Sequence, residues 1–151
     1  MAGIEKGSVA ARAAWSLIDP DAVQRIDVSL LPDDVRTEVI RSLMILARSV
    51  MRAIAISARI DFPELRATFW QQLAALPRDN PASESVRILV TASDDPEVAD
   101  LVTAYTFGNA DPADVAIEFG VLLNILASGY TETFGEPPSR YYDKIRAWLC
   151  V

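Results

Sequence analysis

Residues 111–133 read DPADVAIEFGVLLNILASGYTET, and this stretch decides the fold. Asp111 is a residue type that caps helix N-termini, and Pro112 fits the first helical position, where no N–H bond is needed. Residues 115–127 are apolar on nearly every side of a helix, which is typical of a buried helix. We therefore expect a central hydrophobic helix over residues 111–133, with the other helices packed around it.

Two polar side chains, Glu118 and Asn124, interrupt this helix. The unbroken apolar run is too short for a membrane span, so we expect a core helix and no membrane partner. A buried carboxylate needs a cationic or hydrogen-bonding partner. We expect Glu118 to pair with an arginine of another helix. The alternative is that it serves as a polar anchor in a ligand pocket or an interface.

Small residues gather on one strip of the same helix. At about 100° per residue they share an arc on which the backbone of another helix can lie close. The strip consists of Ala113, Ala116, Gly120, Ala127 and Thr131.

Prolines with acidic neighbours occur at intervals along the rest of the chain. Five of the nine prolines stand in the strings IDPDAV, LPDDVR, DFPELR, DDPEVA and ADPADV, each an expected helix start. Strand signals are weak, and only residues 86–90 offer a short candidate. The pattern predicts an all-α fold, a compact bundle of seven or eight helices. The expected helices cover residues 8–18, 20–28, 32–60, 63–76, 81–92, 96–106, 112–133 and 138–150.

Length and composition indicate one domain over residues 8–151 after a flexible N-terminus over residues 1–7. The chain has 151 residues, of which 51% are hydrophobic, so it is long and apolar enough to bury a core. Its net charge of −7 disfavours nucleic acids and anionic membranes as partners. Residues 1–7 lack the features of a signal peptide, so we expect a cytoplasmic location. Arginine far outnumbers lysine, which suits a GC-rich bacterial genome.

Several common chemistries are excluded by the residues that are missing. The chain has no histidine, which removes imidazole bases, histidine-assisted nucleophiles and histidine metal sites. Cys150 is the single cysteine, so an internal disulfide and a cysteine metal site are excluded. No P-loop or GxGxxG string occurs. We expect no cofactor, no metal and no catalytic residue. Only carboxylate chemistry with a divalent ion remains open.

That remaining chemistry is represented by two short strings. Asn124, Ser128 and Glu132 in NILASGYTE resemble the N-x3-S-x3-E magnesium triad of class I terpene synthases. Asp94 and Asp95 in DDPEVAD look like the start of that family's aspartate-rich motif. The resemblance is confined to these strings, and it implies magnesium-dependent diphosphate chemistry with these side chains as ligands.

A broader resemblance concerns architecture. FPELR at residues 62–66 and the run ADPADVAIEFGVLLNILASGYTETFG at residues 110–135 are similar in texture to the ligand-binding domain of TetR-type regulators. The resemblance implies two long dimerising helices and an apolar pocket. Residues 1–50 show no helix-turn-helix, so the DNA-binding part is not expected.

Four arginines form a stripe along the expected helix at residues 32–60. Their spacings of seven, four and seven place them on one face. We expect a solvated face or a set of salt bridges, with anion binding as the alternative. One of them is the expected partner of Glu118. The stripe consists of Arg41, Arg48, Arg52 and Arg59.

Aromatic residues at helical spacing are usually core residues. Two adjacent pairs are informative, because both members of a pair cannot face the same core, so one of each should be exposed or in an interface. These pairs are Phe69–Trp70 and Tyr141–Tyr142. The last helix should bury a seam of Tyr141, Ile145, Trp148 and Leu149. The candidate ligand or interface residues are Glu118, Asn124, Trp70, Tyr105, Tyr130, Tyr141 and Tyr142.

These observations favour a non-catalytic, acidic helical protein that binds a macromolecular partner, as immunity, inhibitor, chaperone and adaptor proteins do. That partner is another protein or a second copy of the chain, which would dimerise through an antiparallel hairpin of residues 111–133 and 138–150. One alternative is a domain that binds an apolar small molecule between its helices. The other is an enzyme that uses carboxylates and magnesium.

Overall fold

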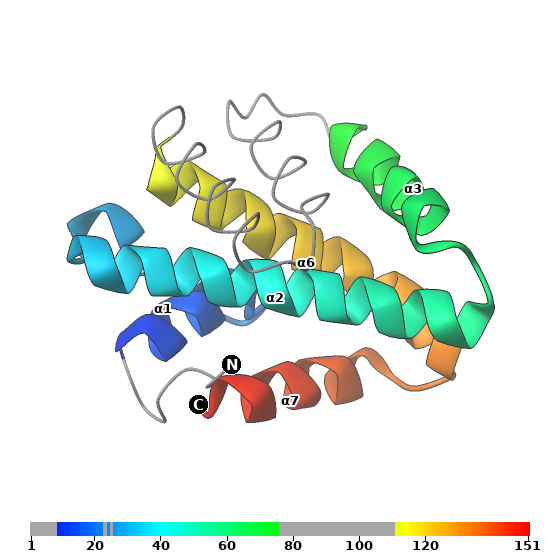
Figure 1. The fold of residues 1–151 in the computed structure, drawn as a ribbon. Coiled ribbons are helices and arrows are strands. Elements are labelled where there is room, and N and C mark those ends of the chain that lie inside the picture. The colour runs from blue at the N-terminus through cyan, green and yellow to red at the C-terminus, as the bar shows by residue number, and fades with distance from the viewer. Residues whose placement is uncertain (1–8, 23, 25, 76–110) are drawn as a thin grey trace.

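The computed structural model describes residues 9–22, 24, 26–75 and 111–151 (Figure 1). These residues form helices joined by turns, and they contain no strand. The expected all-α fold is therefore confirmed. The elements are α1 (Val9–Ile18), a 3-10 turn η1 (Val28–Leu30), α2 (Asp33–Ala58), α3 (Phe62–Ala74), α6 (Pro112–Phe134) and α7 (Pro138–Leu149).

Helix α6 begins and ends where its capping residues predict. The side chain of Asp111 accepts a hydrogen bond from the N–H of Ala113 at 2.9 Å, and Pro112 is the first helical residue. At the other end Gly135 adopts a left-handed conformation with φ 65°, and its N–H donates to the carbonyl of Thr131. Glycine adopts this conformation without the cost that a Cβ atom imposes. Both ends are thus fixed by local chemistry.

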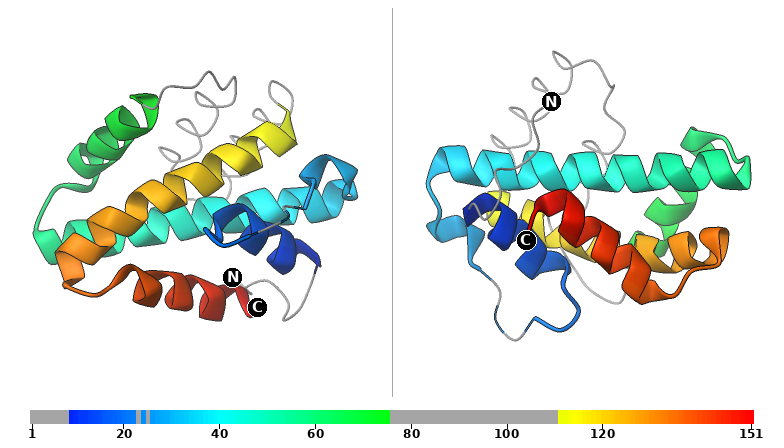
Figure 2. Two further views of the ribbon diagram at one scale, coloured as in Figure 1. Left: turned by 180° about the vertical axis from the view of Figure 1, so that it is seen from behind. Right: turned by 90° about the horizontal axis from the view of Figure 1, so that it is seen from below.

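The other described helices pack around α6. Helices α2 and α6 make the most extensive contact of any described pair and cross in the middle of the molecule (Figure 1). Helix α3 lies over the C-terminal part of α6 on one side, and α7 lies on the other (Figure 2). Helix α1 contacts α2, α6 and α7. One shared core joins all five helices, and Phe119, Leu123 and Leu126 of α6 lie within it at 0% exposure.

The expected number of helices is not supported. The described residues contain five α-helices, whereas seven or eight were expected. Two of the expected helices, over residues 81–92 and 96–106, lie outside the described residues, as do the strand candidate at residues 86–90 and the expected flexible segment at residues 1–7.

The helix expected over residues 20–28 is wrong. Its described residues form turns before the short η1 turn. Asp19 accepts a hydrogen bond from the N–H of Asp21, and Asp27 accepts one from the N–H of Ser29. Ser16 Oγ accepts a third from the N–H of Ile26 at 3.2 Å. Short polar side chains compete in this way with the hydrogen bonds of a helix, so acidic residues beside Pro20 close turns instead.

Among the described helices, only α6 is long and apolar enough to cross a membrane by length and composition. In the structure, 56% of its apolar window is buried inside the protein. The core helix of a soluble protein passes the same test, so this helix alone is weak evidence for a membrane span.

Helix α1 approaches α6 closely at Gly120. A Cβ atom on Gly120 would fall against the backbone carbonyl of Leu17, and the carbonyl carbon would lie only 3.1 Å away. Backbone atoms in a packed helix cannot move aside cheaply. The close helix contact expected on the small-residue strip is therefore confirmed at this residue.

We predict that Gly120→Ala lowers the free energy of unfolding by about 1–3 kcal/mol, because the added methyl forces α1 away from α6. This loss should appear even though alanine favours helices by about 1 kcal/mol over glycine. Gly129→Ala is the matched control. Its Cβ would first meet Cζ at the far end of the Phe69 side chain, which can tilt about its Cα–Cβ bond more readily than backbone can move, so its cost should be smaller. Urea denaturation of both variants measures the difference, and equal stability of Gly120→Ala and the wild type would contradict the close approach.

Candidate functional site

Helices α6 and α7 form an antiparallel hairpin around the short loop Gly135–Pro137 (Figure 1). Two consecutive tyrosines of α7 bind two consecutive residues of α6. The hydroxyl of Tyr141 donates to the carbonyl of Leu123 at 2.6 Å. The hydroxyl of Tyr142 donates to Oδ1 of Asn124 at 2.8 Å. Both bonds join residues 18 positions apart, so they fix the register of the hairpin.

An aromatic row follows the seam between these helices. The ring centroids of Phe134 and Tyr130 are 4.4 Å apart, and those of Tyr130 and Tyr141 are 5.3 Å apart. Tyr141 and Tyr142 meet edge to face at 5.2 Å. Tyr142 in turn meets Trp15 of α1 at 6.5 Å. Such pairs hold aromatic rings in defined orientations, so the row links three helices rigidly.

Cations lie at both ends of the row. Lys144 Nζ donates to the hydroxyl of Tyr130 at 2.6 Å and to Oε2 of Glu136 at 3.1 Å. Both hydrogen bonds raise the pKa of Lys144 above its usual value, and the bond with Tyr130 has the larger effect. At the other end, the guanidinium of Arg146 lies 5.5 Å from the ring centroid of Trp15. Cation–π contacts of this length are favourable, and both cations remain exposed to solvent.

The adjacent tyrosines divide between core and surface. Tyr141 is buried, and this burial raises the pKa of its hydroxyl well above the usual range. Tyr142 is half-buried, and burial raises its pKa as well. Both hydroxyls therefore stay protonated at neutral pH and act as hydrogen-bond donors. The site is suited to holding and presenting side chains rather than to proton abstraction.

Glu118 lies apart from this row. It is six residues from Asn124 on α6, which places the two side chains on different faces of the helix. Glu118 is 0% exposed and has an interaction partner. Asn124 is half-buried and faces Tyr142. The two residues named as polar anchors of one pocket thus do not lie together.

The residues of the terpene-synthase-like triad separate in a similar way. The side-chain oxygen of Asn124 faces α7, where it accepts from Tyr142. Ser128 is exposed and donates to the carbonyl of Ile125, and Glu132 lies one turn further along the helix. Within the described residues, no group of three acidic or cysteine side chains is placed to hold a metal. Asp94 and Asp95 lie outside the described residues.

The arginine stripe of α2 is not uniform. Arg41, Arg52 and Arg59 are exposed, whereas Arg48 is half-buried. Arg52 lies 5.1 Å from the ring centroid of Phe62 at the start of α3. Arg59 leaves the helical face, because it is the C-cap of α2 with a left-handed φ of 56°. The stripe therefore ends before Arg59.

Two of the candidate residues lie outside the described part of the chain: Tyr105 and the side chain of Trp70. The candidate site residues of the sequence analysis did not include Trp15, which belongs to the row, or Lys144 and Arg146, which contact it. The sequence of α7 does contain a signal for Lys144, because Arg140, Lys144 and Trp148 are spaced four residues apart and so share one edge of the helix. Trp148 was instead assigned to the buried seam, and it is 37% exposed. The seam consists of Tyr141, Ile145 and Leu149.

We predict that Tyr141→Phe lowers stability by about 1 kcal/mol at pH 7, because a buried hydrogen bond is lost. It should also reduce the sensitivity to alkaline pH. The folded-state pKa of Tyr141 is raised, so its contribution is complete below the usual tyrosine pKa of about 10 and is lost as pH rises above it. Urea titrations at pH 8 and pH 10.5 test this. Tyr142→Phe, which affects a less buried ring, is the control, and an unchanged alkaline loss in Tyr141→Phe would contradict the assignment.

The predicted pairing of Glu118 with the α2 stripe can be tested by a double-mutant cycle. Arg48 is the preferred partner, because it is the one stripe residue that is not exposed and the partner of a fully buried carboxylate must itself approach the core. Glu118→Gln and Arg48→Gln should show a coupling of about 1–3 kcal/mol in unfolding free energy. Arg59→Gln should show none. Additive effects of Glu118→Gln and Arg48→Gln would exclude this pair.

Comparison with known proteins does not assign the chain to a family. No model of a known protein family matches the chain. No curated protein is significantly similar to it, and no solved structure matches it significantly. Neither family resemblance noted in the sequence gains support from these comparisons. Any proposal on function therefore rests on the chain's own residues and their geometry.

Proposed function

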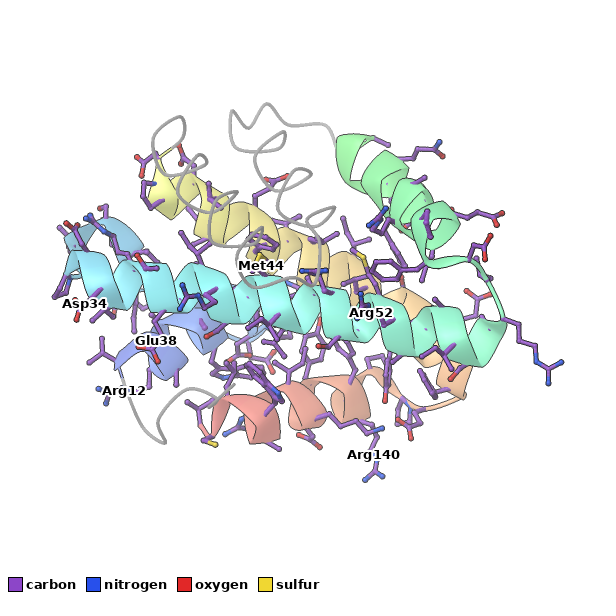
Figure 3. The ribbon with its side chains drawn as sticks, in the orientation of Figure 1. Arg12, Asp34, Glu38, Met44, Arg52 and Arg140 are labelled. Carbon is purple, nitrogen blue, oxygen red and sulfur yellow. The ribbon has the colours of Figure 1, made fainter. Side chains whose placement is uncertain are left out.

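We propose that this protein is a non-catalytic helical protein that binds a macromolecular partner through the outer surface of α7. The observation that carries the proposal is the outward flank formed by Arg140, Lys144 and Trp148. Their spacing of four residues places them along one edge of the helix. Figure 3 shows Arg140 extending from α7 away from the other helices. Trp148 is 37% exposed, which is high for the largest apolar side chain.

Two of these three residue types, tryptophan and arginine, are among those that contribute most to protein interfaces. Tryptophan, tyrosine and arginine dominate the few residues that carry most of the binding energy. Lys144, the middle residue of this flank, is held by Tyr130 and Glu136. Side chains that are already ordered lose less conformational entropy when a partner binds. The surface is therefore preorganised for an interface.

The charge of α7 favours an acidic contact surface on the partner. The helix carries Arg140, Lys144 and Arg146 against Asp143, and Glu136 in the preceding loop pairs with Lys144, so a small excess of cations remains here in a chain of net charge −7. Opposite charges across an interface favour the correct encounter and disfavour wrong partners. A two-fold dimer through α7 would bring two copies of the same cationic surface together. A separate protein is accordingly preferred to the homodimer.

The proposal predicts that Trp148→Ala weakens partner binding by about tenfold or more, as loss of an interface tryptophan does. Arg140→Glu should weaken it further at low salt, because the charge opposite the partner is reversed. The partner is first identified by affinity capture with the wild-type chain, and its Kd for each variant is then measured by calorimetry.

Ile56→Ser is the matched control, since Ile56 of α2 is 78% exposed and belongs to a different helix. It should leave the Kd unchanged. The proposal is wrong if no protein is enriched by the wild-type chain, or if Ile56→Ser weakens binding as much as Trp148→Ala does.

A further inference from the structure

A groove of about 320 Å³ opens between the C-terminal end of α2, α3 and the C-terminal part of α6. We propose that it binds a small apolar molecule that carries a protonated amine. Its volume is at the lower end of the range for ligand sites, which suits a compact ligand. None of the lining residues belongs to α7, so this site is independent of the proposed partner surface.

The floor of the groove is apolar. Ile54, Leu65 and Phe69 line it with exposures of 2%, 5% and 4%. Gly129 of α6 makes this floor possible, because a Cβ atom there would lie 2.7 Å from Cζ of Phe69. The missing side chain lets the ring lie directly on α6. Ile60 also lines the groove and is 39% exposed, so a ligand that covers it removes apolar surface from water, which favours binding.

The rim of the groove is polar and accepts hydrogen bonds. Glu132 and Ser128 lie one turn apart on α6, and Gln72 faces them from α3. Ser128 uses its own proton in a hydrogen bond to the carbonyl of Ile125 at 3.0 Å, so its hydroxyl oxygen is left to accept. Carboxylate, hydroxyl and amide oxygens together match the three N–H donors of an ammonium group.

The charge of the lining selects between ligand classes. Among the described residues that line the groove, Glu132 is the one that carries a charge, and it makes no hydrogen bond or ion pair with the part of the chain described here. Arg52 and Arg66 lie 5.1 and 5.0 Å from the ring centroid of Phe62, and no described arginine lines the groove. A carboxylate ligand would meet a like charge, whereas an amine meets an opposite one. The geometry thus favours an apolar amine over a fatty acid.

The test compares three probes with the same eight-carbon chain: n-octylammonium, n-octanol and n-octanoate. Each is titrated into the full-length protein by calorimetry, and the melting temperature is followed in parallel. Octylammonium should bind with a stoichiometry of one and raise the melting temperature by a few degrees at saturation. Octanol should bind about fivefold more weakly, as expected for loss of an exposed charge pair. Octanoate should bind least.

Two variants connect the binding to the groove. Glu132→Gln should reduce octylammonium affinity to that of octanol and leave octanol unchanged. Ser128→Trp should fill the groove and abolish binding of all three probes. If Ser128→Trp does not fold, Ala58→Trp on the opposite wall serves the same purpose. Glu38→Gln is the matched control, because it removes an exposed carboxylate of α2 far from the groove (Figure 3).

Three outcomes would overturn the proposal. The first is that the wild-type chain binds none of the probes. The second is that octylammonium, octanol and octanoate bind equally. The third is that octylammonium binding survives both Glu132→Gln and the groove-filling variant, or that Glu38→Gln weakens it as much as Glu132→Gln does. Either result would show unspecific attraction to a chain of net charge −7. Partner binding through α7 is measured separately, so the two proposals can fail independently.

Discussion

The structure depends on the enclosure of α6 by its neighbours. A helix that is apolar on nearly every side is stable in water only when other elements cover it. Helices α1, α2, α3 and α7 all contact α6, and together they bury Phe119, Leu123 and Leu126 completely. Helix α1 approaches α6 closely, because Gly120 brings backbone against backbone at Leu17. The rest of the fold follows from how each helix attaches to this one.

The two candidate sites are consequences of those attachments. Helix α7 is fixed when Tyr141 and Tyr142 bind Leu123 and Asn124, which turns one flank of α7 toward solvent. Helix α3 is fixed when Phe69 lies on Gly129, and the space beside that contact is the groove. Both sites thus stand on rigid helices, a requirement for selective binding. Neither involves Glu118, which is 0% exposed.

Much of the fold could be predicted from local chemistry. Asp111 and Pro112 set the start of α6, and the small-residue strip located the contact at Gly120, because capping and residue size act over a few neighbouring residues. The same signals failed near Pro20, where Asp19 and Asp27 close turns. The sites could be predicted only in part. The partners of Tyr141 and Tyr142 depend on hairpin register, and the groove depends on contact between distant segments, which no local pattern encodes.

Amide hydrogen exchange along α6 tests the central claim most directly. If the neighbouring helices cover α6 on every side, the amide hydrogens of residues 119–127 should exchange with solvent only when the whole molecule unfolds. Their opening free energy should then equal the free energy of unfolding from urea denaturation, and it should fall in parallel when the protein is destabilised. Exchange of these amides as fast as that of the exposed residues of α7, without global unfolding, would contradict the account.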